Sequence, residues 1–229
     1  MGTFPRIHLV VLAVTALGLA SASSASALLP DLSLLASESF PWTAEGTAAG
    51  AYNVTTLIGS SFICTGLTIK VEFVQLGSLG IYRLTFTGCK EGATNKCKTG
   101  AEPAETVVIT GEAHLVFISL SPLTVGVLYL VPTTTLLCGP AGSPEKLKIK
   151  IEGSSLARFT GALNTNLTMY TTVIHGSKGK AENAKYLNSE GKEVEASLKA
   201  NFGLGSEGAD MNSEKELEDK GAAMFIING

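Results

Sequence analysis

Four glutamates come nearest to a catalytic set in this chain. Glu72, Glu105, Glu112 and Glu152 all lie in or beside stretches with strand-like patterns. Two carboxyl groups about 5 to 10 Å apart can hydrolyse a glycosidic bond, one as the acid and the other as the base or nucleophile. Sequence separation does not show whether any two of these side chains face each other. A secreted hydrolase that uses these glutamates, for example a carbohydrate-active one, is therefore our alternative hypothesis.

Histidines and aspartates are scarce beyond the first 27 residues. His114 lies in an apolar stretch, which predicts a packed or edge-exposed side chain, and His175 precedes a glycine at an expected turn. The chain from 32 to 209 contains no aspartate, so a Ser-His-Asp arrangement would need an acid from the ends of the chain or a glutamate. We therefore predict no catalytic residue and no enzyme activity.

Two short motifs resemble cofactor and metal sites but lack the required context. Residues 203–208 match GxGxxG, but a dinucleotide site needs a complete βαβ unit and an acidic residue about 20 positions later. Asp210, Asn212 and Glu214 alternate like calcium ligands, yet the glycine and glutamate that a calcium loop needs later in the motif are missing. We predict a glycine-rich turn followed by a capped helix start, with no cofactor and no metal.

Four cysteines, Cys64, Cys89, Cys97 and Cys138, form an even set. Their intervals contain no C-x2-4-C pair, which argues against a zinc site. In an exported chain an even set indicates two disulfides, and three pairings are possible. We favour Cys89–Cys97, which would close a polar loop, together with Cys64–Cys138, which would link two expected strands.

The first 27 residues have the three parts of an export signal. Arg6 gives a positive start, residues 9–20 are an unbroken apolar run, and Ala25-Ser26-Ala27 is a small-x-small cleavage pattern. The apolar run has 12 residues, whereas a membrane-spanning helix needs about 20. An uncleaved anchor is the alternative, but it leaves the small-residue tail unexplained. We predict a signal peptide over 1–27 and a secreted, extracellular protein without a transmembrane anchor after cleavage.

Charge and aromatic content restrict the kind of partner. The formal net charge is −3 and becomes −4 without Arg6, because the signal has no acid. A mildly acidic chain without a basic cluster gives no electrostatic reason to bind nucleic acid or an anionic membrane. Aromatic residues make up 7%, and Trp42 is the only tryptophan, so few rings are present to stack on sugars. We expect an unknown extracellular ligand, for example cell-wall material or polysaccharide.

From about Tyr52 the chain alternates between short runs of β-prone residues and turn residues, which is typical of all-β proteins. The clearest case is 146–152, where Leu147, Ile149 and Ile151 are separated by lysines, and this predicts a strand with one buried face. The expected strands are 62–65, 68–75, 81–87, 106–110, 113–120, 124–131, 147–152, 156–160 and 167–174.

A long stretch without Asp, Glu, Lys or Arg covers 113–144. Ser121-Pro122 interrupts it, and no basic residues flank it as they flank many membrane spans. We therefore predict two buried strands joined by a turn at Ser121-Pro122.

The remaining segments lie at the two ends of the exported chain. Residues 28–50 are expected to be a loosely attached lead-in or to hold a short helix at 31–37. Charge is concentrated in 176–221, where Ser213 to Glu216 fits a helix capping box, and this predicts one short helix. Residues 222–228 resemble a closing strand.

The order of several motifs resembles a known group of proteins. SSFICTG leads to LTFTGC, KCKTG, VGVLYLVP, TTTLLCG and KIKIEGSSLARFTG, and the similarity covers 60–192. Only TFTGC and the spacing of the four cysteines are specific. The chain resembles uncharacterised exported β-rich four-cysteine proteins of actinobacteria, a group with no known activity, ligand or site residue. The resemblance implies export and a disulfide-stabilised β fold.

Together these patterns predict a single all-β domain over 51–229, an antiparallel sandwich or flattened barrel with one short C-terminal helix. Its polar, charge-rich part is 176–221. The leading functional hypothesis is an exported, non-catalytic binding or structural domain, because the chain combines an export signal and paired cysteines with few catalytic residues.

Overall fold

The fold is all β. The computed structural model describes residues 29–34, 41–73, 79–140, 146–160, 163, 169–174, 176–177, 180–181, 185–203, 205–219 and 224–228, and this part of the chain contains no helix. The predicted signal peptide and His175 lie outside the described residues. The strands are β1 (Pro30–Leu34), β2 (Trp42–Thr56), β3 (Ser61–Phe73), β4 (Leu79–Thr87), β5 (Lys90–Glu91), β6 (Asn95–Thr99), β7 (Thr106–Leu120), β8 (Leu123–Gly139), β9 (Leu147–Phe159), β10 (Met169–Ile174), β11 (Gly176–Ser177), β12 (Lys180–Ala181), β13 (Lys185–Leu187), β14 (Glu193–Glu195), β15 (Leu198–Asn201), β16 (Ser206–Asp219) and β17 (Met224–Asn228).

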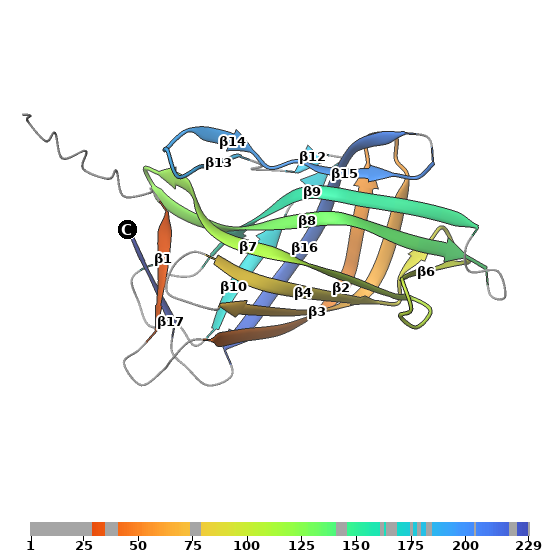
Figure 1. Cartoon of the computed structure of the whole chain (residues 1–229), viewed down its shortest axis with the longest axis horizontal. Coiled ribbons are helices and arrows are strands. Elements are labelled where there is room, and N and C mark those ends of the chain that lie inside the picture. The colour runs from red at the N-terminus through yellow and green to blue at the C-terminus, as the bar shows by residue number, and fades with distance from the viewer. Residues whose placement is uncertain are drawn as a thin grey trace, which may run out of the picture.

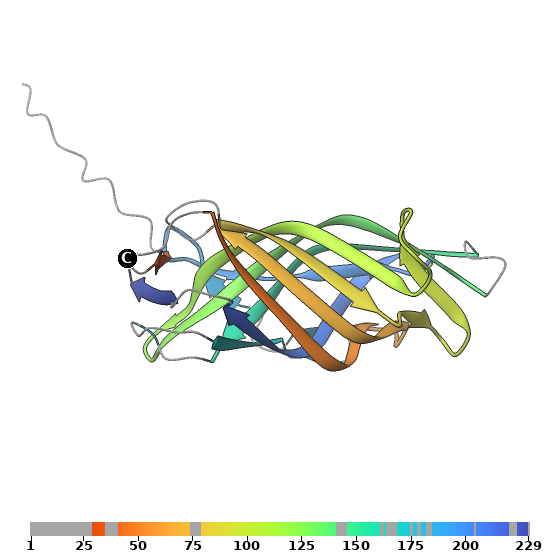
Figure 2. The same ribbon diagram turned by 90° about the horizontal axis from the view of Figure 1, so that it is seen from below.

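Hydrogen-bonded pairing closes the main sheet on itself, because β2 pairs with β3 on one side and with β16 on the other. At the end with the β2–β3 turn, the ring of eight strands runs β2, β3, β5, β6, β8, β9, β15, β16. At the opposite end β4 and β7 take the places of β5 and β6, and β10 takes the place of β15. All these pairings are antiparallel, so the sheet forms a closed barrel, and Figures 1 and 2 show that it is long and flattened.

Apolar side chains fill the inside of the barrel. On β9, Ile149 and Ile151 are fully buried and the alternating Lys148 and Lys150 are exposed, which confirms the alternation predicted for this strand. The buried residues of all the long strands join in one continuous cluster. Burying one such side chain contributes about 1.5 to 3 kcal/mol. The interior is therefore a packed core and provides the main driving force for the closed sheet.

The predicted hairpin in the uncharged stretch is confirmed. β7 ends at Leu120 and β8 begins at Leu123, so Ser121-Pro122 forms the turn. Val116 and Leu128 point to the outside of the wall, where they form a second apolar cluster, with Tyr186 of β13 packed against it. Burial on both faces explains why the sequence of this hairpin shows no alternation of polar and apolar residues.

Several strands that the sequence divides in two are continuous in the structure. β3, β7 and β9 each cover two of the expected short strands. Glycine suggested the breaks, but Gly111 and Gly153 are needed where another chain segment approaches closely. A Cβ atom at Gly111 would lie 2.2 Å from the Leu130 carbonyl oxygen, and one at Gly153 would lie 2.1 Å from the Ser197 carbonyl oxygen. These glycines permit close packing and do not end strands.

Three local expectations are corrected. The short helix predicted from the capping box at Ser213 is absent, because β16 runs through it and pairs with β2 and β10. The helix or loose segment expected at 31–37 begins as strand β1, which pairs with β17, so the predicted closing strand is confirmed. The boundary at residue 50 falls inside β2, whose first residue, Trp42, is 5% exposed and stacks on Phe73. Pairing with a neighbouring strand outweighs the local helix signals.

Candidate functional site

The structure does not gather the four glutamates into one site. Glu72 lies opposite Ile81 on the next strand, and Ile81 lies opposite Glu112, so the two carboxylates share a rung two strands apart. Two strand spacings place their Cα atoms about 10 Å apart. Ile81 between them is 55% exposed, and all three side chains point outward from the barrel wall. This arrangement holds two carboxylates at an outer surface, with an apolar side chain between them.

The other two glutamates have partners of their own. Lys90 and Lys96 each place their Nζ atom 3.3 Å from a carboxylate oxygen of Glu105. The hydrogen bond from Lys96 is the main cause that lowers the pKa of Glu105. Glu152 accepts a hydrogen bond of 2.6 Å from the Thr133 hydroxyl. Both carboxylates therefore have hydrogen-bond partners on neighbouring strands.

His114 is on the outer face of β7, beside Glu112. Its Nε2 atom lies 3.2 Å from a carboxylate oxygen of Glu112, and its side chain is 30% exposed. A histidine oriented by a carboxylate can act as a general base when a nucleophile lies within hydrogen-bond reach. Among the described residues, the hydrogen bonds of this pair reach no serine, threonine or cysteine side chain. The second histidine of the prediction, His175, lies outside the described residues.

The GxGxxG segment is the turn between β15 and β16, as predicted. Asn201 Oδ1 accepts hydrogen bonds from the backbone N–H groups of Gly203 at 2.7 Å and Gly205 at 3.4 Å. Both glycines have positive φ angles, +97° and +119°, which favour glycine. Asp210 follows on β16 and is 2% exposed, so it belongs to a strand and not to a calcium loop. Among the described residues no group of three or more His, Cys, Asp or Glu side chains is placed to hold a metal ion.

A hollow at the β2–β3 end of the barrel was not predicted. Glu207 lies opposite the buried Ala200 in register, and its Oε2 atom is buried without a hydrogen-bond partner among the described groups. The hollow is lined by Thr56, Ile58, Ser60, Ala200, Phe202, Gly205 and Glu207. The sequence gives one signal of this hollow, which is Glu207, a glutamate at a position where strand alternation predicts an apolar side chain.

The two disulfides join different partners from those we favoured. Cys64 is bonded to Cys89, and Cys97 to Cys138. Cys97 and Cys138 face each other in the register of β6 and β8, and Cys89 precedes β5, which pairs with β3 beside Cys64. The favoured pairing is therefore wrong. It assumed that 89–97 is a free loop, whereas this segment enters the barrel wall between β3 and β8.

Lysines gather on the outer wall around β9. We call this set the lysine face, and it consists of the half-buried Lys98 on β6 and four exposed lysines, Lys146 just before β9, Lys148 and Lys150 on β9, and Lys199 on β15.

Register and strand geometry place these lysines close to one another. Lys98 and Lys148 are both opposite Leu137 of β8, one on each side, which places their Cα atoms about 10 Å apart. Lys148 and Lys150 are about 7 Å apart on one strand. Lys199 is diagonal to Lys150, a separation of about 7 to 8 Å.

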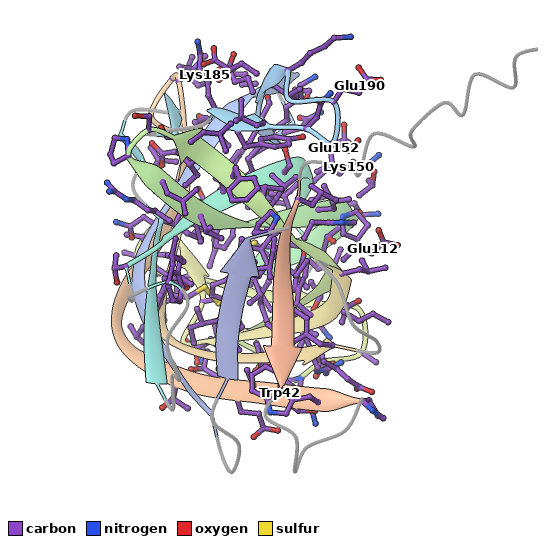
Figure 3. All side chains as sticks on the ribbon, turned by 90° about the vertical axis from the view of Figure 1, so that its left-hand side faces the viewer. Trp42, Glu112, Lys150, Glu152, Lys185 and Glu190 are labelled. Atoms are coloured by element: carbon purple, nitrogen blue, oxygen red, sulfur yellow. A yellow bond between two sulfur atoms is a disulfide. The ribbon has the colours of Figure 1, made fainter. Side chains whose placement is uncertain are left out.

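The lysine face differs from most of the described surface in its ion pairs. Elsewhere, six positively charged side chains meet carboxylates within 3.5 Å, in the pairs Lys70–Glu45, Arg83–Glu102, Lys90–Glu105, Lys96–Glu105, Lys185–Glu193 and Lys192–Glu190. Arg158, exposed near the end of β9, forms no ion pair with a described carboxylate. Among the described residues, no carboxylate forms an ion pair with a lysine of the lysine face. Figure 3 shows Lys150 beside Glu152 on one flank, with Lys185 and Glu190 at the top.

Comparisons with known proteins found no match to this chain among protein family models, curated proteins or solved structures. Its membership of the actinobacterial group that it resembles stays a prediction. In the described part of the chain, no helix has the length and apolar character needed to cross a membrane.

Proposed function

We propose that the protein is an exported, non-catalytic binding domain whose ligand contacts the outside of the barrel wall. The observation that carries this proposal is the packed interior. One apolar cluster runs through the barrel, from Trp42 and Phe73 at one end to Phe62 at the other. Apart from the hollow at the β2–β3 end, side chains occupy the inside, so the outer surface is what the barrel offers to a ligand.

Export and the disulfides fit this role. Two disulfides suit a protein that works outside the reducing cytoplasm. The signal-like first 27 residues give the same location. Trp42, the only tryptophan, is buried, so ligand recognition would use polar and charged groups and not a tryptophan platform.

A secreted hydrolase is the second candidate, and one observation favours it. Glu72 and Glu112 share a rung on the outer wall, and His114 contacts Glu112. This set would be the place to look for catalysis. Their outward direction and the intervening Ile81 favour binding over catalysis, because a glycosidase holds its sugar between the two carboxyl groups.

The test uses the exported protein purified from a secreting host. It is incubated separately with insoluble pectate, chitin, cellulose and bacterial cell-wall sacculi, and both the bound protein and the release of reducing ends are measured. We expect retention on at least one of these materials without the release of reducing ends. Retention on none of them would overturn the proposal. Release of reducing ends that is lost in Glu72→Gln or Glu112→Gln, with an unchanged melting temperature, would establish the hydrolase instead.

A further inference from the structure

We infer that the lysine face is a binding surface for a linear acidic polysaccharide, one that carries carboxylate groups along its length. This inference rests on the proposed function and names the ligand class and the surface. It goes against the expectation from overall charge, because the chain as a whole has a formal net charge of −3.

Protection of a sheet edge explains only part of this lysine set. Lysines are often placed on edge strands, where they prevent pairing with another chain. β9 is paired with β8 on one side, but on its other side, among the described residues, only 150–153 pair with β15 and 158–159 with β10. Lys148 therefore lies where one side of β9 is open, whereas Lys150 and Lys199 lie on strands that are paired on both sides at these positions and have no edge to protect.

The charges of this face act together. The five lysines have one carboxylate among them in register, Glu152, which lies opposite Lys199 and accepts a hydrogen bond from Thr133. With Glu145, which directly precedes Lys146 in the sequence, five positive and two negative charges leave a formal charge of +3. The Cα atoms of neighbouring lysines are about 7 to 10 Å apart, comparable to the screening length of about 8 Å at physiological salt. An anion that approaches the wall therefore meets their summed potential.

The spacing and the neighbours of the lysines point to a polysaccharide. Lys148 and Lys150 are about 7 Å apart along β9, with Lys146 just before the strand, so a chain with regularly repeated negative charges can contact more than one lysine at once. The residues opposite Lys150 in register are Thr135 and Asn201, whose hydroxyl and amide groups can hydrogen-bond to sugar hydroxyls.

Other polyanions fit this surface less well. The outward residues that lie between the lysines in register on β8 and β15 include no Phe, Tyr or Trp on which a nucleic-acid base could stack. The apolar neighbour, Leu137, is half-buried, so no large exposed apolar side chain is offered to a membrane at this position. A carboxylated sugar polymer needs neither feature.

The experiment compares two triple variants of the exported protein that lose the same charge. Lys148→Gln, Lys150→Gln and Lys199→Gln neutralise the lysine face. Lys70→Gln, Arg83→Gln and Lys192→Gln form the matched control, because each of these residues is already in an ion pair. Binding to soluble polygalacturonate is measured by calorimetry at low and raised ionic strength. Neutral dextran, single-stranded DNA and phosphatidylglycerol vesicles serve as comparison probes.

We expect polygalacturonate to bind the unmodified protein and the control alike, and the lysine-face variant about tenfold more weakly. Raised salt should weaken binding, because the contacts are electrostatic. Equal binding of the two variants would overturn the inference and leave the proposed function standing, as would binding to dextran alone. Tighter binding to DNA or vesicles than to polygalacturonate would also overturn it. No binding to any probe, together with no retention on the insoluble materials, would overturn both proposals.

Discussion

Lys96 and Lys98 lie two residues apart on β6 and point outward from the same wall, yet their surroundings differ. Lys96 shares Glu105 with Lys90, and both ion pairs measure 3.3 Å. Lys98 lies beside Leu137 and faces the lysines of β9. A lysine on the outside of a strand is therefore either neutralised or free to attract an anion, and the neighbouring strands determine which.

The same comparison extends to two adjacent parts of the barrel wall. The stapled side, which is 89–105 without Lys98, is held by two disulfides and by the carboxylate of Glu105. The lysine face is held by backbone pairing and by the buried Ile149 and Ile151 beneath it. On the first side the charges serve the stability of the fold, and on the second side they remain available to a partner.

The largest expected effect on stability comes from removing the disulfides of the stapled side. Cys97→Ala with Cys138→Ala should lower the free energy of unfolding by about 4 kcal/mol, and Cys64→Ala with Cys89→Ala by about 3.5, because the sequence separations are 41 and 25. Urea unfolding measures both losses, and non-reducing peptide mapping checks which disulfide remains. A loss below about 1 kcal/mol in either double variant, or recovery of a Cys89–Cys97 peptide from the unmodified protein, would contradict the observed pairing.

An intermediate effect is expected when the lysine face is given an acid of its own. Thr135 lies opposite Lys150 on the outer face, so Thr135→Glu should form an ion pair there and weaken polygalacturonate binding about tenfold. The free energy of unfolding should change by less than about 0.5 kcal/mol, because the site is at the surface. Thr85→Glu on β4 adds the same charge away from the lysine face and is the control. Equal weakening in both variants would mean that net charge, and not this surface, determines binding.

The smallest expected effect comes from Glu105→Gln, which removes the shared carboxylate and frees Lys90 and Lys96. The ion pairs lower the pKa of Glu105 in the folded protein, chiefly through the hydrogen bond from Lys96. A carboxylate with a lowered folded pKa stabilises the fold at neutral pH, and this contribution is lost as the pH falls through that pKa. The variant should therefore be slightly less stable at neutral pH, and the difference should close in acid.

Urea midpoints measured across the pH range test this prediction. Glu102→Gln, at a carboxylate 3.5 Å from Arg83, is the control for the loss of an exposed acid. A difference between Glu105→Gln and the unmodified protein that stays constant as the pH falls would show that the carboxylate charge is not the cause.

Strands with one wet face were predictable, because alternation is a local property. Tyr82, Leu84 and Phe86 point inward as their spacing indicates, and so do Ile149 and Ile151. The hairpin of β7 and β8 was predictable from its lack of charge and its proline turn. Strand lengths were not predictable. Gly111 suggested a break, but β7 continues through it, and the glycine is needed because the Leu130 carbonyl approaches closely there.

The candidate site was less predictable than the fold. The sequence singled out the glutamates and the histidines by residue type, and the structure leaves three of the four glutamates on the outer wall and Glu105 in an ion-paired loop. The sequence indicated no basic cluster, because Lys98, the lysines of β9 and Lys199 are far apart along the chain. Strand pairing brings them onto one surface.

By itself the sequence determined the all-β class, the inward and outward faces of the strands and the presence of paired cysteines, because these follow from residue type and local spacing. Closure of the sheet, the partners Cys64–Cys89 and Cys97–Cys138, strand β16 in place of the expected helix and the assembly of the lysine face were decided by the tertiary structure. The physical reason is that these features depend on which strands lie side by side. That neighbour relation is set by the burial of the whole core and not by the residues of one segment.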